Sequence, residues 1–159
     1  MTVCRFKLLT LALAAGLASC ALPVAEVPVK KVAAPVATAK PVQMNGRGKV
    51  TSISLTELFA LQQSGNVLLY DARPGFFYGL GHITGAISLP KPDCDAQIEK
   101  REAEIKAAIA AKKPIVIYCT NLLCPDARTV ANHLAGFGYS SSTLSGGWES
   151  WKEAGLPTE

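Results

Sequence analysis

Two short apolar runs most restrict what this chain can fold into. Residues 67–71 read Val-Leu-Leu-Tyr-Asp, and residues 114–119 read Pro-Ile-Val-Ile-Tyr-Cys. Runs of this length, rich in branched and aromatic side chains, are typical of strands that are buried on both faces of a sheet. Because helices must cover both faces of such a sheet, the two runs predict an α/β domain.

Helix signals separate the predicted strands. Ser54 and Glu57 have the spacing of a capping box, and the helix that they start is expected to end at Gly65. This alternation of strands and helices predicts a mainly parallel central sheet with helices on both faces. Beyond the first strand we expect a long helix, a second helix, a weaker strand and a short last helix, at 93–111, 125–136, 141–144 and 148–153.

Cys119 stands where chemistry is expected in such a sheet, at the carboxyl end of a buried strand. A short loop follows and leads into the helix that begins near Pro125. The amides of this loop and the N-terminus of the helix favour an anion, so they would lower the pKa of the thiol. The alternative is that Cys119 is simply a small buried residue that ends the strand.

The start of the chain predicts export and attachment to a membrane. Residues 1–19 resemble a secretory signal peptide, since two basic residues precede a short apolar run and small residues. Leu-Ala-Ser-Cys at 17–20 is similar to the bacterial lipobox, which implies that Cys20 carries lipid. Residues 20–48, rich in Pro, Ala, Val and Lys, predict a disordered tether.

We therefore expect an extracytoplasmic, membrane-anchored lipoprotein, with an ordinary cleaved signal peptide as the alternative. Ala21 follows Cys20 where an acidic residue would favour inner-membrane retention. In a cell with an outer membrane, this favours outer-membrane sorting and a periplasmic domain. In such an oxidising compartment, the odd number of domain cysteines (Cys94, Cys119 and Cys124) indicates at least one free or reactive thiol.

Charge and residue spacing exclude several functions. The predicted domain, 49–159, has ten basic and eleven acidic residues, whereas a nucleic-acid-binding protein needs a clustered basic face. Its cysteines have neither a C-x2-C pair nor a nearby His, so we expect no metal and no other cofactor. Pro125 stands six residues after Cys119, where a phosphatase loop would have Arg, so phosphatase chemistry is not expected.

Several separated segments resemble motifs of the rhodanese-like (sulfurtransferase) domain family. They are Asp-Ala-Arg at 71–73 with Gly-His-Ile-Thr-Gly-Ala at 81–86, Ile-Tyr-Cys at 117–119, Gly-Gly-Trp at 146–148, and Ala-Gly-Leu-Pro at 154–157. Their order and spacing extend the resemblance over 49–159. It implies a three-layer α/β fold with a mainly parallel central sheet between two layers of helices.

The resemblance also implies a sulfurtransferase. Family members carry a sulfane sulfur as a persulfide on a loop Cys and pass it to a thiophilic acceptor. Cys119 would be that nucleophile, and the loop amides would hold a small anionic sulfur donor while it gives its sulfur to Cys119. A thiol would then accept the sulfur from Cys119. The residues of this substrate loop are Thr120, Asn121, Leu122, Leu123 and Cys124. The residues expected to support the site are Asp71, Arg73, His82 and Arg128.

The loop departs from the family pattern, which leaves the substrate open. It contains no cation, and Arg128 lies about a helical turn beyond it. Phe77 stands where an acidic residue is usual, so the expected ion-pair partner of Arg73 is missing. We expect His82 to hydrogen-bond its turn rather than to act in acid–base chemistry.

Two other functions remain open. Cys119 and Cys124 could form a disulfide or a switching dithiol, which would make a thiol-redox protein unless the bridge is only structural. Leu122 and Leu123 could receive a protein partner, as in a non-catalytic binding module of the same fold, or they could pack against the domain.

Overall fold

The computed structural model describes residues 48–159. The predicted signal peptide (1–19), the predicted lipidation site Cys20 and all but the last residue of the predicted tether (20–48) lie outside the described residues. Within 48–159, no helix is both long enough and apolar enough to span a bilayer.

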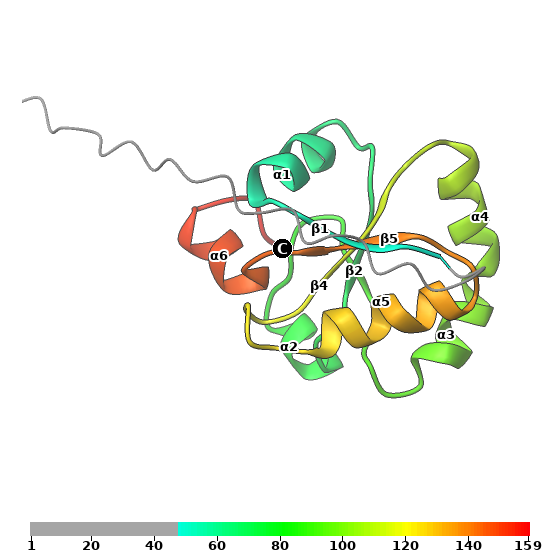
Figure 1. The fold of residues 1–159 in the computed structure, drawn as a ribbon. Helices are drawn as coiled ribbons and strands as arrows, with labels where there is room; N and C mark the ends of the chain where they lie inside the picture. The colour runs from blue at the N-terminus through cyan, green and yellow to red at the C-terminus, as the bar shows by residue number, and fades with distance from the viewer. Residues whose placement is uncertain (1–47) are drawn as a thin grey trace, which may run out of the picture. The chain divides into compact units, whose positions relative to one another are not determined.

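The centre of the domain is a five-stranded sheet in which all paired strands are parallel (Figure 1). Its order is β1-β5-β4-β2-β3, so the two apolar runs of the sequence form neighbouring inner strands, β2 and β4. Every residue of β2 and β4 is buried, which confirms the prediction of strands covered on both faces. The strands are β1 (Val50–Ile53), β2 (Leu68–Asp71), β3 (Ile87–Ser88), β4 (Ile115–Tyr118) and β5 (Ser141–Leu144).

Helices cover both faces of this sheet, which confirms the predicted three-layer α/β architecture. α1 and α6 pack on one face, and α3, α4 and α5 pack on the other (Figure 1). The side chains of β4 alternate between the two cores: Ile115 and Ile117 face α3, α4 and α5, whereas Val116 and Tyr118 face α1 and α6. The helices are α1 (Leu55–Gln63), α2 (Gly75–Gly79), α3 (Cys94–Lys100), α4 (Glu102–Ala110), α5 (Asp126–Gly136) and α6 (Gly147–Glu153).

The predicted capping box starts α1. The Ser54 hydroxyl accepts from the Glu57 amide (3.3 Å), and the Glu57 carboxylate accepts from the Ser54 amide (2.9 Å). The helix ends at Gln63, slightly earlier than predicted, and Gly65 follows with a positive φ of 65°.

The single long helix predicted over 93–111 is wrong, because α3 and α4 are separated at Arg101. The Arg101 amide is shared between the carbonyls of Gln97 and Ile98, both at 3.1 Å, a pattern common at helix ends. α4 begins at Glu102, and Ile98 of α3 and Ile105 of α4 are both buried in the same core. No Pro or Gly marks this break in the sequence.

Candidate active site

Cys119 directly follows the last residue of β4, so the end of that strand fixes its position. Its side chain is only 3% exposed and lies in the core beneath α5. It forms a disulfide with Cys124, with the two Cα atoms 6.1 Å apart, within the range of native disulfides. The expectation of an accessible, ionised thiol is therefore not met in this oxidised state, because the sulfur is bonded and buried.

Asn121 organises the loop that carries the disulfide. Its backbone carbonyl accepts from the Cys124 amide (3.2 Å), and its side-chain oxygen accepts from the Leu123 amide (3.1 Å). Its side-chain nitrogen donates to the carboxylate of Glu149 in α6 (3.0 Å). Asn121 thus folds the loop back on itself, which brings Cys124 within bonding distance of Cys119.

Two of the five amides expected to surround an anion are occupied inside the loop, those of Leu123 and Cys124. Within the described part of the chain, the amides of Thr120, Asn121 and Leu122 donate no hydrogen bond. The donors that remain for an anionic ligand are therefore at the start of the loop. The sequence does not show which of the loop amides remain free, because this depends on the turn that Asn121 makes.

The beginning of α6 supports the loop from the other side. The amides of Trp148 and Glu149 donate to the carbonyls of Cys119 (2.8 Å) and Thr120 (2.9 Å). Gly147 has a positive φ of 59°, and a Cβ atom there would collide with the Cys119 carbonyl. The Gly-Gly-Trp segment of the sequence therefore allows close approach of two backbones.

Arg73 has an ion-pair partner, contrary to the inference drawn from Phe77. The partner is Asp71, the last residue of β2: Nη2 of Arg73 lies 2.6 Å from Oδ2, and Nε lies 3.0 Å from both carboxylate oxygens. Both side chains are buried, and Nη2 of Arg73 also donates to the carbonyl of Gly81 (2.7 Å). Because the partner is only two residues away in sequence, Arg73 does not need an acidic residue at position 77.

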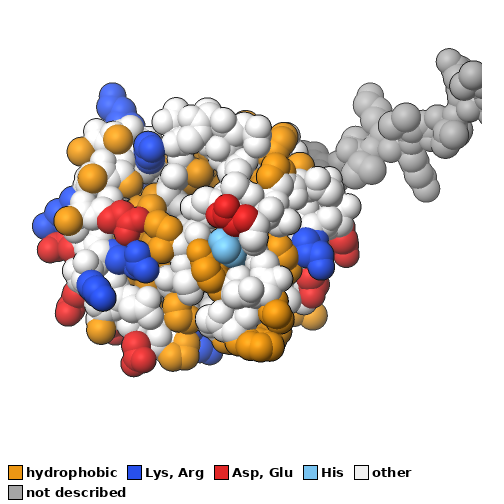
Figure 2. Space-filling view, turned by 180° about the vertical axis from the view of Figure 1, so that it is seen from behind, with side chains coloured by type: hydrophobic (Ala, Val, Ile, Leu, Met, Phe, Trp, Pro, Cys, Tyr) orange, Lys and Arg blue, Asp and Glu red, His pale blue; other side chains and the backbone are white. Residues whose placement is uncertain are grey.

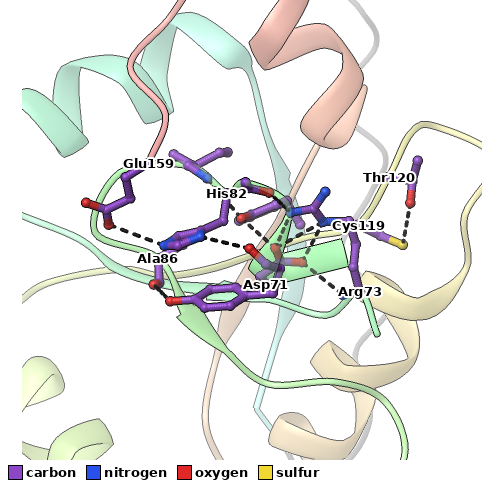
Figure 3. A network of polar contacts seen from close by, with 11 residues as sticks. Asp71, Arg73, His82, Ala86, Cys119, Thr120 and Glu159 are labelled. Carbon is purple, nitrogen blue, oxygen red and sulfur yellow. Dashed lines mark hydrogen bonds and ion pairs between the residues drawn. The ribbon is translucent and has the colours of Figure 1, made fainter. Parts of the chain in front are cut away.

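Figure 3 shows Asp71 and Arg73 of this network. Tyr118, the last residue of the adjacent strand β4, completes it. Its hydroxyl donates to Asp71 Oδ2 (2.8 Å) and accepts from the Ile83 amide (3.1 Å). Burial, with the nearby Asp71 carboxylate, raises the pKa of the Tyr118 phenol, so the hydroxyl keeps its proton. The Arg73 guanidinium lies over the Trp148 ring at 4.6 Å, which connects the network to α6.

His82 bonds its own turn, as expected, and lies apart from the sulfur of Cys119. Its Nδ1 is 3.1 Å from the Tyr78 carbonyl, its ring stacks on the Tyr78 ring, and its Nε2 is 3.4 Å from the Glu159 carboxylate. In Figure 3, His82 and Glu159 lie at one end of the view, and the Cys119 sulfur lies beside Thr120 at the other.

The remaining predicted site residues lie at the surface. Arg128 is exposed on α5, and no ion pair among residues 48–159 includes it. Leu122 and Leu123 are 78% and 90% exposed, so the alternative that they pack against the domain is wrong.

Sequence reasoning missed Asp126 as a site residue. Its carboxylate and the sulfurs of Cys119 and Cys124 all lie within 4.8 Å of one another. It is held by Lys91, whose Nζ is 2.7 Å away. The available signal was an acidic residue in the first turn of a helix, which usually indicates only a favourable helix start.

Comparisons with known proteins agree with this fold. A curated HTH-type transcriptional regulator from Mycobacterium tuberculosis is 34% identical over 111 residues, which are 68% of this chain and 44% of that protein. This chain therefore matches less than half the length of that relative. The BH2092 protein of Bacillus halodurans is 25% identical with a TM-score of 0.59, over 68% of this chain and 75% of that one.

The As-Sb reductase of Leishmania major is 26% identical with a TM-score of 0.53, over 65% of this chain and 78% of that one. Together with the family, this neighbour supports a sulfurtransferase or redox type of role in general terms. The model of the Rhodanese-like domain matches residues 54–154, from the capping box of α1 to the end of α6. The chain therefore belongs to the rhodanese-like domain family.

Proposed function

We propose that the domain is a rhodanese-type thiol-redox protein, in which Cys119 accepts a sulfane sulfur and Cys124 releases it as sulfide. The observation that carries this proposal is the Cys119–Cys124 disulfide at the carboxyl end of β4. A sulfurtransferase that passes sulfur from one Cys to an external thiol needs no second thiol in its loop. A second thiol at bonding distance supplies an internal reductant.

The reaction begins with the reduced pair and a sulfane-sulfur donor such as thiosulfate. The Cys119 thiolate attacks the outer sulfur of thiosulfate, the sulfur–sulfur bond of the donor breaks, and sulfite leaves. The Cys124 thiol then attacks Sγ of Cys119. The disulfide forms, the persulfide bond breaks and the outer sulfur leaves as hydrogen sulfide ion. The sulfane sulfur gains two electrons, and the two thiols lose them.

Asp126 is suited to move the proton in the second step. Its carboxylate lies within 4.8 Å of both sulfurs, so it can take the proton of the Cys124 thiol and pass it to the departing sulfide. The contact with Lys91 keeps this carboxylate oriented at the start of α5. The unoccupied amides of Thr120, Asn121 and Leu122 are the donors that would hold the anionic sulfur compound.

The test is to give reduced full-length protein thiosulfate or polysulfide and to measure sulfide, persulfide and disulfide in one turnover. The wild type should release sulfide and form the Cys119–Cys124 disulfide. Cys124→Ser should keep the added sulfur as a persulfide on Cys119, detected by mass spectrometry, and Cys119→Ser should take up none. Cys94→Ser, which removes the one cysteine of residues 48–159 that lies outside the bridge, should behave as the wild type.

Other results would contradict the proposal in distinct ways. Sulfide release by Cys124→Ser with an added small thiol, at the wild-type rate, would indicate simple sulfur transfer through Cys119. No sulfur adduct with any donor, with the bridge unaffected by reductant, would indicate a non-catalytic binding module.

Turnover also requires a reductant for the disulfide, and we propose that a protein dithiol fills this role. Cys119 is 3% exposed, whereas Cys124 is half-buried and borders the exposed Leu122 and Leu123. Attack on Cys124 forms a mixed disulfide and frees Cys119. The exposed leucines would contact the partner around that sulfur.

A second apolar area lies on α2 and the residue that follows it, where Phe76 is 72% and Leu80 is 70% exposed. Figure 2 shows hydrophobic side chains gathered at the lower right of the face in view, the region of α2 when Figure 1 is turned by 180°. α2 follows β2, and the disulfide loop follows the adjacent strand β4, so both lie at the carboxyl edge of the sheet. This area would enlarge the surface offered to a protein partner.

We further propose that this chemistry takes place outside the cytoplasm, with the domain held at a membrane by lipid on Cys20. The lipobox resemblance at 17–20 supports this location. Labelling with a radioactive fatty acid should mark the wild type and not Cys20→Ser, and fractionation should find the wild type with membranes. Recovery of both forms as unlabelled cytoplasmic protein would contradict the assignment.

A further inference from the structure

A second group of reactive side chains lies away from the disulfide loop, between α3 and α5. Cys94 and Asp95 are the first two residues of α3, and His133 lies in the last turn of α5. One donor atom of each residue, the Cys94 sulfur, an Asp95 oxygen and a His133 ring nitrogen, lies within 4.8 Å of the other two. His133 Nδ1 and Asp95 Oδ1 are 2.6 Å apart.

These three donor types are those of zinc sites in proteins. Zn²⁺ binds thiolate sulfur at about 2.3 Å and imidazole nitrogen or carboxylate oxygen at about 2.0–2.2 Å, so donor atoms of a tetrahedral site lie about 3.3–3.7 Å apart. The observed donor atoms would need only small movements to reach that arrangement. The His133–Asp95 contact would open by roughly 0.7 Å, with two metal bonds replacing one hydrogen bond.

The surroundings leave room for an ion to enter. Cys94 is 3% exposed and closes the site from the core, whereas Asp95 and His133 reach the surface. A hollow of about 450 Å³ adjoins the two surface residues, and Glu99 and Asn132 also line it. An ion held by three protein ligands would therefore keep a coordination position open to water from this hollow.

We propose that Cys94, Asp95 and His133 form a binding site for a zinc-like divalent transition metal ion, separate from the disulfide loop. The sequence predicted no metal because its cysteines have no histidine close by. The packing of α3 against α5 supplies one that is 38 residues from Asp95. The thiolate favours zinc or cobalt over magnesium or calcium, which prefer ligands that are all oxygen.

The test is titration of full-length protein, with its disulfide intact, with Co²⁺ alone and then with Zn²⁺ in competition. Wild type should bind one equivalent at this site and develop a thiolate-to-cobalt charge-transfer band with the visible spectrum of a tetrahedral ion. Zn²⁺ should abolish both signals and raise the unfolding temperature, because binding to the folded state stabilises it.

Variants locate the ion. Cys94→Ser should lose the charge-transfer band. His133→Ala and Asp95→Asn, both in partly exposed side chains that tolerate change, should each weaken Co²⁺ binding by about tenfold or more. The double variant Cys119→Ser/Cys124→Ser should keep the band, because it changes only the other cysteine cluster. Wild type without the band, or a band that survives in Cys94→Ser and His133→Ala, would overturn the proposal.

Discussion

The turns that follow the neighbouring strands β2 and β4 lie at the same edge of the sheet but are stabilised in different ways. The turn after β2 is fixed by the buried ion pair of Asp71 and Arg73. Asp71 also accepts a hydrogen bond from Tyr118, and Arg73 donates one to the carbonyl of Gly81. The loop after β4 is closed by one covalent bond and exposes two leucines. The first turn contains no group that changes its oxidation state. In the second turn, a two-electron reduction would break the disulfide and open the loop.

This difference indicates that the two turns have different roles at the carboxyl edge of the sheet. Removing one partner of a buried, fully paired ion pair lowers the free energy of unfolding by several kcal/mol. Such a pair therefore keeps the surrounding backbone in one geometry. A disulfide in a short loop contributes less and is reversible under the right reductant. We infer that Asp71 and Arg73 serve as a fixed frame, against which the Cys119–Cys124 loop changes its oxidation state.

The largest expected effect concerns that frame. Asp71→Ala would leave the Arg73 guanidinium buried without its partner, so it should lower the free energy of unfolding by about 3–5 kcal/mol in urea titrations. As a control, Glu104→Ala removes a partly exposed partner of Arg101 and should hardly move the transition. Equal shifts in the two variants would remove the basis of the comparison.

A smaller effect is expected where α6 supports the disulfide loop. Gly147→Ala would combine a left-handed backbone with a collision against the Cys119 carbonyl, and we expect a loss of about 2–4 kcal/mol. Gly155 is the matched control, because it has a similar φ of 65° and no atom within 4 Å of an added Cβ. Gly155→Ala should cost only about 1–2 kcal/mol by thermal or urea unfolding. A Gly147→Ala cost no larger than that of Gly155→Ala would mean that the loop can shift away from α6.

Reducing the disulfide should lower the free energy of unfolding by less than Asp71→Ala does. The closed loop is short, so the loop-entropy account gives about 2 kcal/mol of stabilisation. The free energy of unfolding with and without reductant measures this difference, and Cys119→Ser/Cys124→Ser should show no further change on adding reductant. A loss as large as that of Asp71→Ala would mean that the bridge is a structural support of the whole domain.

The fold was largely predictable from the sequence because its signals are local. The runs at 67–71 and 114–119 and the capping box at Ser54 each depend on neighbouring residues alone. The break at Arg101 has no such signal, since the surrounding residues favour helix throughout. The edge strand β1 is short and half polar, and only its pairing with β5 defines it.

The site was predictable in part. The position of Cys119 at a strand end followed from the pattern, but its oxidation state did not, because a sequence is the same with and without the bond. The prediction that Arg73 lacks a partner was wrong, because Asp71 supplies the carboxylate that the family pattern has at position 77. Asp126 gained its neighbours through the folding of the Cys119–Cys124 loop, and His133 gained its neighbours through the packing of α3 against α5.

The smallest expected change in stability concerns the exposed leucines. Leu122→Ser/Leu123→Ser should alter the free energy of unfolding by no more than about 0.5 kcal/mol, since both side chains are in solvent. The same variant should slow reduction of the disulfide by a thioredoxin, used as the protein dithiol, and leave reduction by dithiothreitol unchanged. Equal slowing with both reductants would show that the leucines only shape the loop.

The most direct measurement is the ratio of sulfide released to disulfide formed when reduced wild-type protein meets a single equivalent of thiosulfate. Rapid alkylation followed by mass spectrometry counts the disulfide, and a colorimetric assay counts the sulfide. The proposed chemistry predicts one sulfide for each Cys119–Cys124 disulfide, with no lasting persulfide. A persulfide that persists on Cys119 while Cys124 is alkylated as a free thiol would contradict it.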